Sequence, residues 1–291
     1  MKGRGKIGRI VKYRKYEIVF YEREVLSGYT YEIFRGGRSV YYLGKERFCE
    51  YGHSVGDMGE VDEHRRYLKS HGAVKAPGPQ VRKRIRTARR FVEAAKWVVP
   101  GADITGDGKP NLVVWNKCHR RGGLSIFQVG RTFKHILTVD LGEAGPMLDD
   151  LVDLDRDGYP EIELNDTTNY CSTTTCGGSP TPRVVLKWKR GKFRVAGALM
   201  RRPAPSDAAL RKEAKRIAPE TIGMGAAWEH LFKRVIDLVY SGNATAARKL
   251  VRYAYPKKAG AALAWWKGIV RRWLPDSPYY RDIVQLNGGK L

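Results

Sequence analysis

The chain carries the same acidic loop twice, and this duplication constrains its fold more than any other feature. Residues 103–114 read Asp-Ile-Thr-Gly-Asp-Gly-Lys-Pro-Asn-Leu-Val-Val, and residues 153–164 read Asp-Leu-Asp-Arg-Asp-Gly-Tyr-Pro-Glu-Ile-Glu-Leu. The two segments align without a gap, 50 residues apart. Each has oxygen-bearing side chains at positions 1, 3, 5 and 9, a glycine at position 6, and then a β-prone apolar run. A repeated loop-plus-strand unit indicates a β-repeat architecture.

The spacing of the oxygen-bearing side chains is typical of a calcium loop. Alternate positions of a tight loop direct their oxygens at one centre, and the glycine permits the positive φ that turns the chain. Ca²⁺ takes about six to eight oxygen ligands, so we expect one or two Ca²⁺ ions. Position 12 is Val114 in one loop and Leu164 in the other, and strands follow, so neither loop is an EF-hand. The candidate ligands are Asp153, Asp155, Asp157 and Glu161 in the second loop, and Asp103, Thr105, Asp107 and Asn111 in the first.

The second loop is the stronger candidate of the two. Its four carboxylates repel one another unless a cation neutralises them. The first loop has only Asp103 and Asp107 as charged ligands. The alternative for either loop is a metal-free Asp-Gly turn, held by hydrogen bonds from the backbone to aspartate side chains.

These residues resemble the FG-GAP/VCBS repeat family, whose hallmark is a D-x-D-x-D-G-x-x-D loop leading into a strand. The resemblance covers roughly residues 100 to 200, and the Cys118-His119-Arg-Arg-Gly-Gly stretch is similar to small bacterial VCBS-like proteins. It implies propeller-like blades, Ca²⁺ in the loop, and a secreted or periplasmic location. The basic segment Met1–Tyr16 lacks the apolar run of a secretory signal, so the chain itself does not indicate export.

The alternation of β-prone runs and turns predicts about three hairpin units, two of which carry the loop. Closed propellers typically need about four or more blades. We therefore expect a β-rich α+β fold: an open propeller-like stack of antiparallel β-hairpin repeats with a helical C-terminal cap. The expected parts are a basic flexible arm (1–15), a β-repeat domain (16–200) with loop-bearing repeats at about 100–150 and 151–200, and an α-helical region (201–291).

Helical periodicity is clear in several segments. Residues 80–99 place Val81, Ile85 and Ala88 on one face, whereas residues 57–79 are polar and punctuated by Gly and Pro, which predicts a loop or an insertion. Ser206 is the expected N-cap of a helix over 207–217, and Asn243 that of a later one. The remaining helices are expected over 226–240, 244–255, 261–274 and 279–286.

The net charge of +24 makes a polyanion, such as nucleic acid or an acidic glycan, a candidate partner. The strongest candidate surface is the basic face of the 80–99 helix; the alternative is an ordinary solvated face. No stretch of about 18 apolar residues predicts a transmembrane segment. The candidate polyanion-binding residues are Arg82, Lys83, Arg84, Arg86, Arg89 and Arg90.

The cysteine spacing and a search for catalytic motifs narrow the functional classes that the sequence supports. Cys171 and Cys176 are close enough for a local disulfide, and no CxxC pair indicates structural zinc. We find no nucleophile elbow, HExxH, P-loop, or dinucleotide fingerprint between a strand and a helix. We therefore expect a non-enzymatic calcium-binding β-repeat module with a structural or binding role and an unknown partner. The alternatives are a nucleic-acid or other polyanion-binding protein and a metal-dependent hydrolase.

Overall fold

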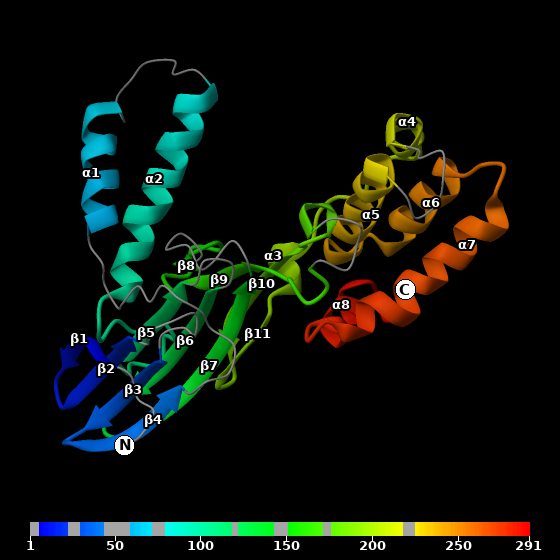
Figure 1. The fold of residues 1–291 in the computed structure, drawn as a ribbon. Helices are drawn as coiled ribbons and strands as arrows, with labels where there is room; N and C mark the ends of the chain where they lie inside the picture. The colour runs from blue at the N-terminus through cyan, green and yellow to red at the C-terminus, as the bar shows by residue number, and fades with distance from the viewer. Residues whose placement is uncertain are drawn as a thin grey trace. The chain divides into compact units, whose positions relative to one another are not determined.

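A computed structural model describes residues 6–22, 30–43, 59–71, 79–117, 122–142, 151–170, 176–217 and 225–291. The chain divides into two compact units: residues 1–162 with 188–193, and residues 163–187 with 194–291. Within the described residues the fold is mixed α+β, with three small antiparallel sheets and no closed barrel or propeller (Figure 1). The expected α+β class is therefore confirmed.

The first sheet is a four-stranded antiparallel meander. Its strands are β1 (Lys6–Tyr13), β2 (Tyr16–Glu22), β3 (Thr30–Arg35) and β4 (Arg38–Leu43), in that order. Strand β1 lies where we expected a flexible arm. It pairs with β2 along its length, and Lys12 Nζ lies 3.2 Å from Glu17 Oε1 on the opposite strand. Cross-strand pairing and opposite charge explain why this basic segment is ordered.

The second sheet contains β5 (Asn111–Lys117), β6 (Gly122–Val129) and β7 (Phe133–Gly142), also antiparallel. It shares a hydrophobic core with the first sheet. Alternate residues of each strand point into this core, as the two-residue period of a strand requires. The core residues are Tyr16, Ile18 and Ile33 from the first sheet and Leu112, Val114, Phe127 and Val129 from the second.

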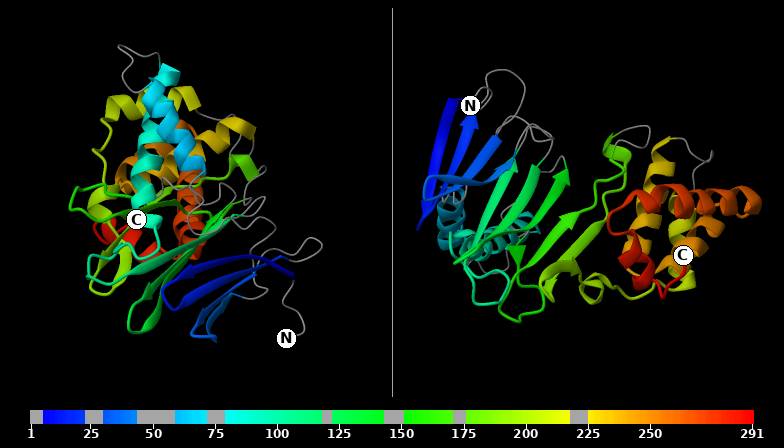
Figure 2. Two further views of the ribbon diagram at one scale, coloured as in Figure 1. Left: turned by 90° about the vertical axis from the view of Figure 1, so that its left-hand side faces the viewer. Right: turned by 90° about the horizontal axis from the view of Figure 1, so that it is seen from below.

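Two helices lie between these sheets in the sequence, α1 (Gly59–His71) and α2 (Pro79–Val98). They pack side by side, as Figure 2 shows from two further directions. Helix α2 also contacts β5 and β8, and its Ala94, Ala95 and Val98 are buried. The helix expected over 80–99 is confirmed, but the loop expected over 57–79 is wrong because most of that segment is α1.

The third sheet carries the second acidic loop. Its strands are β8 (Leu151–Val152), β9 (Glu161–Asn165), β10 (Arg183–Lys189) and β11 (Lys192–Val195), and the sheet order is β11-β10-β9-β8. Strand β8 pairs with β9 through Leu151 and Ile162, so the loop is the connection of a β-hairpin.

Beyond residue 196, the described secondary-structure elements are all helical. The helices are α3 (Gly197–Met200), α4 (Asp207–Ile217), α5 (Gly225–Tyr240), α6 (Ala244–Ala254), α7 (Ala259–Gly268) and α8 (Tyr280–Leu286). A π-helical turn at Ile269–Trp273 and a 3₁₀ turn at Leu274–Asp276 follow α7. In the described part of the chain, no helix is both long enough and apolar enough to cross a membrane.

The caps of these helices agree only partly with the expectation. Ser206 Oγ accepts a hydrogen bond from Ala209 N at 3.2 Å, as expected of the α4 N-cap. Asn243 precedes α6, but its side chain forms no cap hydrogen bond. Instead, Asn287 Oδ1 accepts from Ala244 N at 2.8 Å. The expected Asn243 side-chain cap is therefore wrong, because its amide donates to the carbonyl oxygens of Arg202 and Ser241.

Candidate metal centre

The second loop is wrapped around the carboxylate of Asp153. Asp153 Oδ1 accepts from Asp157 N at 3.1 Å, and its Oδ2 accepts from Gly158 N at 3.0 Å. Asp157 Oδ1 in turn accepts from Tyr159 N at 3.1 Å. These bonds close a tight turn between β8 and β9 and hold the first aspartate at its centre.

Glu161 closes the loop from the first position of β9. Its side chain is only 1% exposed, and its Oε2 accepts from Leu154 N at 2.8 Å. Asp153, Asp155 and Glu161 each have one carboxylate oxygen that lies within 4.8 Å of the other two. Two ligands of one Ca²⁺ are at most about 5 Å apart, because each lies about 2.3–2.6 Å from the ion. A single cation could therefore contact all three side chains.

The first loop has the same hydrogen-bonded framework. Asp103 Oδ2 accepts from Gly108 N at 2.8 Å, Asp107 Oδ1 from Lys109 N at 3.1 Å, and Asn111 Oδ1 from Ile104 N at 2.9 Å. Each bond corresponds to one in the second loop, 50 residues later. The sequence duplication is therefore also a duplication of backbone structure.

The backbone angles of the two loops correspond as well. Gly108 and Gly158 at position 6 have φ values of 75° and 92°. Position 4 is Gly106 with φ 69° in the first loop and Arg156 with φ 64° in the second. Position 4 therefore needs the left-handed conformation in both loops, although only the first has a glycine there.

The first loop differs because hydrogen donors surround its carboxylates. Thr105 Oγ1 lies 2.9 Å from Asp107 Oδ1, and Asp107 Oδ2 accepts from Gln128 Nε2 at 2.8 Å and from Lys109 Nζ at 3.1 Å. Burial raises the pKa of Asp107, but the hydrogen bonds from Gln128, Lys109 and Thr105 outweigh it and leave the pKa below its ordinary value. These donors do in the first loop what a cation would otherwise do.

Asn111 is a second chemical difference between the first loop and the second. It is 1% exposed, like Glu161 at the same position, but its second polar atom is an amide nitrogen. The bond from Ile104 N fixes Oδ1, and Nδ2 is buried with no hydrogen-bond partner among the described residues. An N–H group in that place repels a cation, whereas the Glu161 carboxylate attracts one.

The two loops touch each other through Tyr159. A Cβ atom added to Gly106 would lie 3.0 Å from Cε2 of the Tyr159 ring. Tyr159 is 41% exposed, and its ring lies against the backbone of Gly106. This contact explains why position 4 is glycine in the first loop and can be arginine in the second.

Only some of the predicted metal ligands lie close enough together to bind one ion. In the described residues, the second loop alone forms a cluster of three or more candidate ligands, and Asp157 is not part of it. Of the first-loop residues, Asp103, Thr105 and Asp107 are joined by hydrogen bonds, and Asn111 binds the loop backbone. Sequence reasoning missed Lys109 and Gln128. Lys109 is visible two residues after Asp107, whereas Gln128 is brought in by its pairing with Asn111 across β5 and β6.

The other predicted sites are less complete. Cys176 is disulfide-bonded, and its expected partner Cys171 lies outside the described residues. On α2, the side chains of Arg82, Lys83, Arg84, Arg86 and Arg89 are exposed, and that of Arg90 is half-buried.

The comparisons with known proteins give no further assignment. Searches of protein-family models, curated proteins and solved structures each find no match to this chain.

Proposed function

We propose that this chain is a non-enzymatic calcium-binding β-repeat module, with one Ca²⁺ bound in the second loop and a structural or binding role. The observation that carries the proposal is the convergence of Asp153, Asp155 and Glu161. The shared framework of the two loops supports the same origin for both repeats. It also supports the finer architecture that the resemblance implies, an open propeller-like stack of FG-GAP/VCBS type.

Calcium suits this donor set better than other common cations. The three candidate ligands are carboxylates, and no sulfur or imidazole lies among them. Hard oxygen ligands favour Ca²⁺, Mg²⁺ or Mn²⁺ over Zn²⁺ or copper. Mg²⁺ demands a near-ideal octahedron, whereas Ca²⁺ accepts an irregular shell of carboxylates, backbone carbonyls and water. The second loop has one buried carboxylate, Glu161, and two more accessible ones, Asp153 and Asp155, which suits the irregular shell of Ca²⁺.

The proposed role of the ion is to hold the β8–β9 hairpin. Strand β8 has only two residues, so backbone pairing alone gives it little stability. An ion contacting Asp153 and Asp155 on one side and Glu161 on the other joins the end of β8 to the start of β9. Calcium that binds only the folded chain then stabilises it by mass action.

Thermal unfolding with and without calcium tests the proposal. At a free Ca²⁺ concentration 100 times the dissociation constant, the gain is about 2.7 kcal/mol, or a rise in Tm of about 5–10 °C. Asp155→Asn should abolish this rise. Asp155 is the best position to change because it is exposed, whereas Asp153 accepts two backbone hydrogen bonds that fold the loop.

The matched control is Asp107→Asn in the first loop. This variant also removes one carboxylate, so it should lower the Tm of the metal-free protein but keep the full calcium-dependent rise. A rise that persists in Asp155→Asn, or that disappears in Asp107→Asn alone, would contradict a site in the second loop.

A further inference from the structure

Five cationic side chains lie on three turns at one end of the first and second sheets. In an antiparallel meander every second turn lies at the same edge, so the β1–β2 and β3–β4 turns are neighbours. The β6–β7 turn of the second sheet lies at the same end. The side chains are Arg14 and Lys15 between β1 and β2, Arg35 and Arg38 beside the β3–β4 turn, and Arg131 between β6 and β7. We call these five residues the turn cluster.

Hydrogen bonds hold the three turns side by side. Gly36 N donates to Lys15 O at 3.1 Å, which joins the first two turns. Arg35 Nη2 donates to Arg131 O at 2.6 Å, which joins the second turn to the third although the two residues are 96 positions apart. The turn cluster is therefore a product of the fold, and no local sequence pattern shows it.

Arg35 is held in place by the residues around it. It is half-buried, and its Cζ atom lies 5.7 Å from the centre of the Tyr16 ring. Tyr16 is itself 1% exposed, and its hydroxyl donates to Gly130 O at 3.2 Å. Because its side chain is already ordered, Arg35 loses little conformational freedom when it meets an anion, and this favours binding.

The turn cluster carries positive charge without acidic partners. Within the described ranges none of its five members forms an ion pair, whereas Lys12 on β1 pairs with Glu17 at 3.2 Å. Arg35 and Arg38 are directly opposite each other on β3 and β4, where like charges destabilise a sheet. An anion bound beside them removes this repulsion. Apart from the half-buried Arg35, all members of the turn cluster are exposed to a partner.

We propose that the turn cluster binds the phosphate backbone of double-stranded nucleic acid, without reading its sequence. Four of its five members are arginines, whose planar guanidinium can donate two parallel hydrogen bonds to a phosphate. The β1–β2 and β3–β4 turns are two strand spacings apart, about 10 Å, so the cluster is wide enough for several phosphates of a polymer. A duplex carries about one negative charge per 1.7 Å of its axis. This inference is independent of the calcium site.

The surroundings of the turn cluster favour a duplex over a single strand and over an anionic membrane. Proteins that bind single strands stack the bases on exposed aromatic rings, but here Tyr13 and Phe133 pack against the hydrophobic core. Membrane-surface segments insert large apolar residues, and the tips of the three turns have none. The tip residues are Arg14, Lys15, Gly36, Gly37, Arg131 and Thr132.

Salt-dependent binding of a short fluorescein-labelled DNA duplex, measured by anisotropy between about 50 and 200 mM salt, tests the proposal. The logarithm of the association constant should fall linearly with the logarithm of the salt concentration, by about 0.9 in slope for each phosphate neutralised. The triple variant Lys15→Gln, Arg38→Gln, Arg131→Gln should therefore make the slope shallower by about 2.7. No duplex binding at the lowest salt would overturn the proposal, as would an unchanged slope in a triple variant that is folded by circular dichroism.

A charge-conserving variant separates loss of charge from loss of structure. Arg38→Lys combined with Arg131→Lys keeps both cations but removes both guanidinium forks. The slope should stay that of the parent, while the affinity falls. A slope as shallow as that of the triple variant would show that the positive charges are not what the duplex contacts, and would overturn the proposal.

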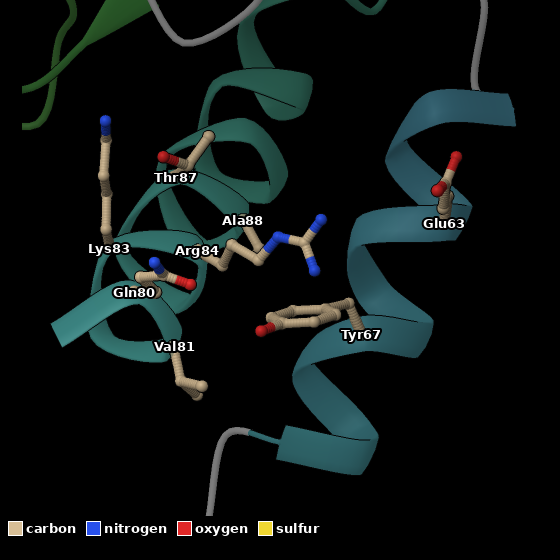
Figure 3. A pocket seen from close by; sticks show the side chains of 8 residues that line it. All are labelled: Glu63, Tyr67, Gln80, Val81, Lys83, Arg84, Thr87 and Ala88. Atoms are coloured by element: carbon tan, nitrogen blue, oxygen red, sulfur yellow. The ribbon is translucent and has the colours of Figure 1, made fainter. Parts of the chain in front are cut away.

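The matched control removes three cations from α2. Arg82, Arg86 and Arg89 are exposed and lie on one face of the helix, because they are separated by four and three residues. This face is opposite the groove between α1 and α2, into which Tyr67 points with Arg84 Cζ 6.0 Å from its ring centre (Figure 3). Changing the three exposed arginines to Gln lowers the net charge equally and should leave the slope unchanged. An equally shallow slope in this control would assign binding to overall charge and overturn the proposal.

Other polyanions provide the last comparison. Oligothymidine, heparin, and vesicles of phosphatidylcholine and phosphatidylserine are titrated at the same salt concentration as the duplex. Tighter binding of any of them, lost in the Lys15, Arg38 and Arg131 triple variant, would overturn the assignment to a duplex, whereas weaker binding of all three supports it. All titrations are run both in chelator and in calcium. Because the turn cluster contains none of the candidate metal ligands, duplex binding should persist in chelator even if the calcium proposal fails.

Discussion

At the scale of single residues, position 4 of the two acidic loops shows that two different residues adopt the same backbone conformation. Gly106 and Arg156 both have positive φ, and the Tyr159 ring lies against the backbone of Gly106. The left-handed conformation costs a non-glycine residue roughly 1–2 kcal/mol. Arg156 is therefore a strained position that the surrounding hydrogen bonds maintain.

Substitutions at position 4 should have opposite effects in the two loops. Arg156→Gly should raise the free energy of unfolding by about 0.5–1 kcal/mol, because relief of the positive φ exceeds the entropy that glycine adds to the unfolded chain. Gly106→Ala should lower it by about 1–2 kcal/mol, because the new Cβ has an unfavourable φ and approaches the Tyr159 ring. Urea unfolding in the presence of a chelator measures the free energy of unfolding of both variants without a contribution from bound metal. Destabilisation by Arg156→Gly would show that the two loops do not share their backbone.

Residue-level prediction from sequence succeeded for local contacts. The hydrogen bonds around Asp103 and Asp153 follow from Asp and Gly spacing within one loop, so the sequence is sufficient to predict a turn. The neutralisation of Asp107 by Gln128 depends on strand register between residues 21 positions apart. The sequence pattern of a single segment does not predict the register between two strands.

At the scale of elements, helices with a clear apolar period were predicted to within a few residues, and α1 was missed. Its apolar residues are few, so its sequence lacks the 3.6-residue period that identifies α2. A weaker signal was present: acids at Glu60, Asp62 and Glu63 precede bases at Arg65 and Lys69, the order that the helix dipole favours. The α6 cap by Asn287 was equally hidden, because that residue lies 43 positions away.

One buried hydrogen-bond group joins three elements of the second unit. Asp166, just after β9, accepts from Tyr240 Oη of α5 at 2.7 Å and from Ser277 Oγ at 2.5 Å. Burial, and then the nearby Asp166 carboxylate, raise the pKa of Tyr240 far above its ordinary value. The folded protein therefore keeps the phenol proton at pH values where the unfolded chain has released it.

This arrangement predicts a loss of stability in alkali. The contribution of Tyr240 is fully present below pH 10 and should fall by about 1.4 kcal/mol per pH unit above it, because only the unfolded chain ionises there. Tyr240→Phe should be less stable than the parent at neutral pH by about 1–3 kcal/mol, since Asp166 loses a donor. The difference between the two proteins should shrink above pH 10. Parallel unfolding curves at all pH values would contradict the assigned network.

At the scale of the whole molecule, the charge of +24 and the acidic loop act against each other. A divalent cation is repelled by the net field of the chain, so only a local cluster of carboxylates can hold it. The second loop has Asp153, Asp155, Asp157 and Glu161 within nine residues. The first has two carboxylates, and one of these already pairs with Lys109. Duplication of sequence therefore does not imply duplication of the metal site.

The whole architecture was less predictable than its parts. The α+β class and three small sheets follow from local β and helical patterns, but the division into units does not fall at residue 200, where composition changes. Residues 163–187 belong with the helices because contacts such as Asn169 Nδ2 to Trp273 O, at 3.0 Å, join them. Those contacts span about a hundred residues and are not visible in any local pattern.

Equilibrium dialysis against calcium tests the central claim most directly, because it counts bound ions. The parent protein should bind one Ca²⁺ per chain, Asp107→Asn should also bind one, and Asp155→Asn should bind none. Two ions in the parent would show that Thr105, Lys109 and Gln128 do not take the place of a cation in the first loop. No ion in the parent, or an unchanged ion in Asp155→Asn, would contradict the assignment of the second loop as the metal centre.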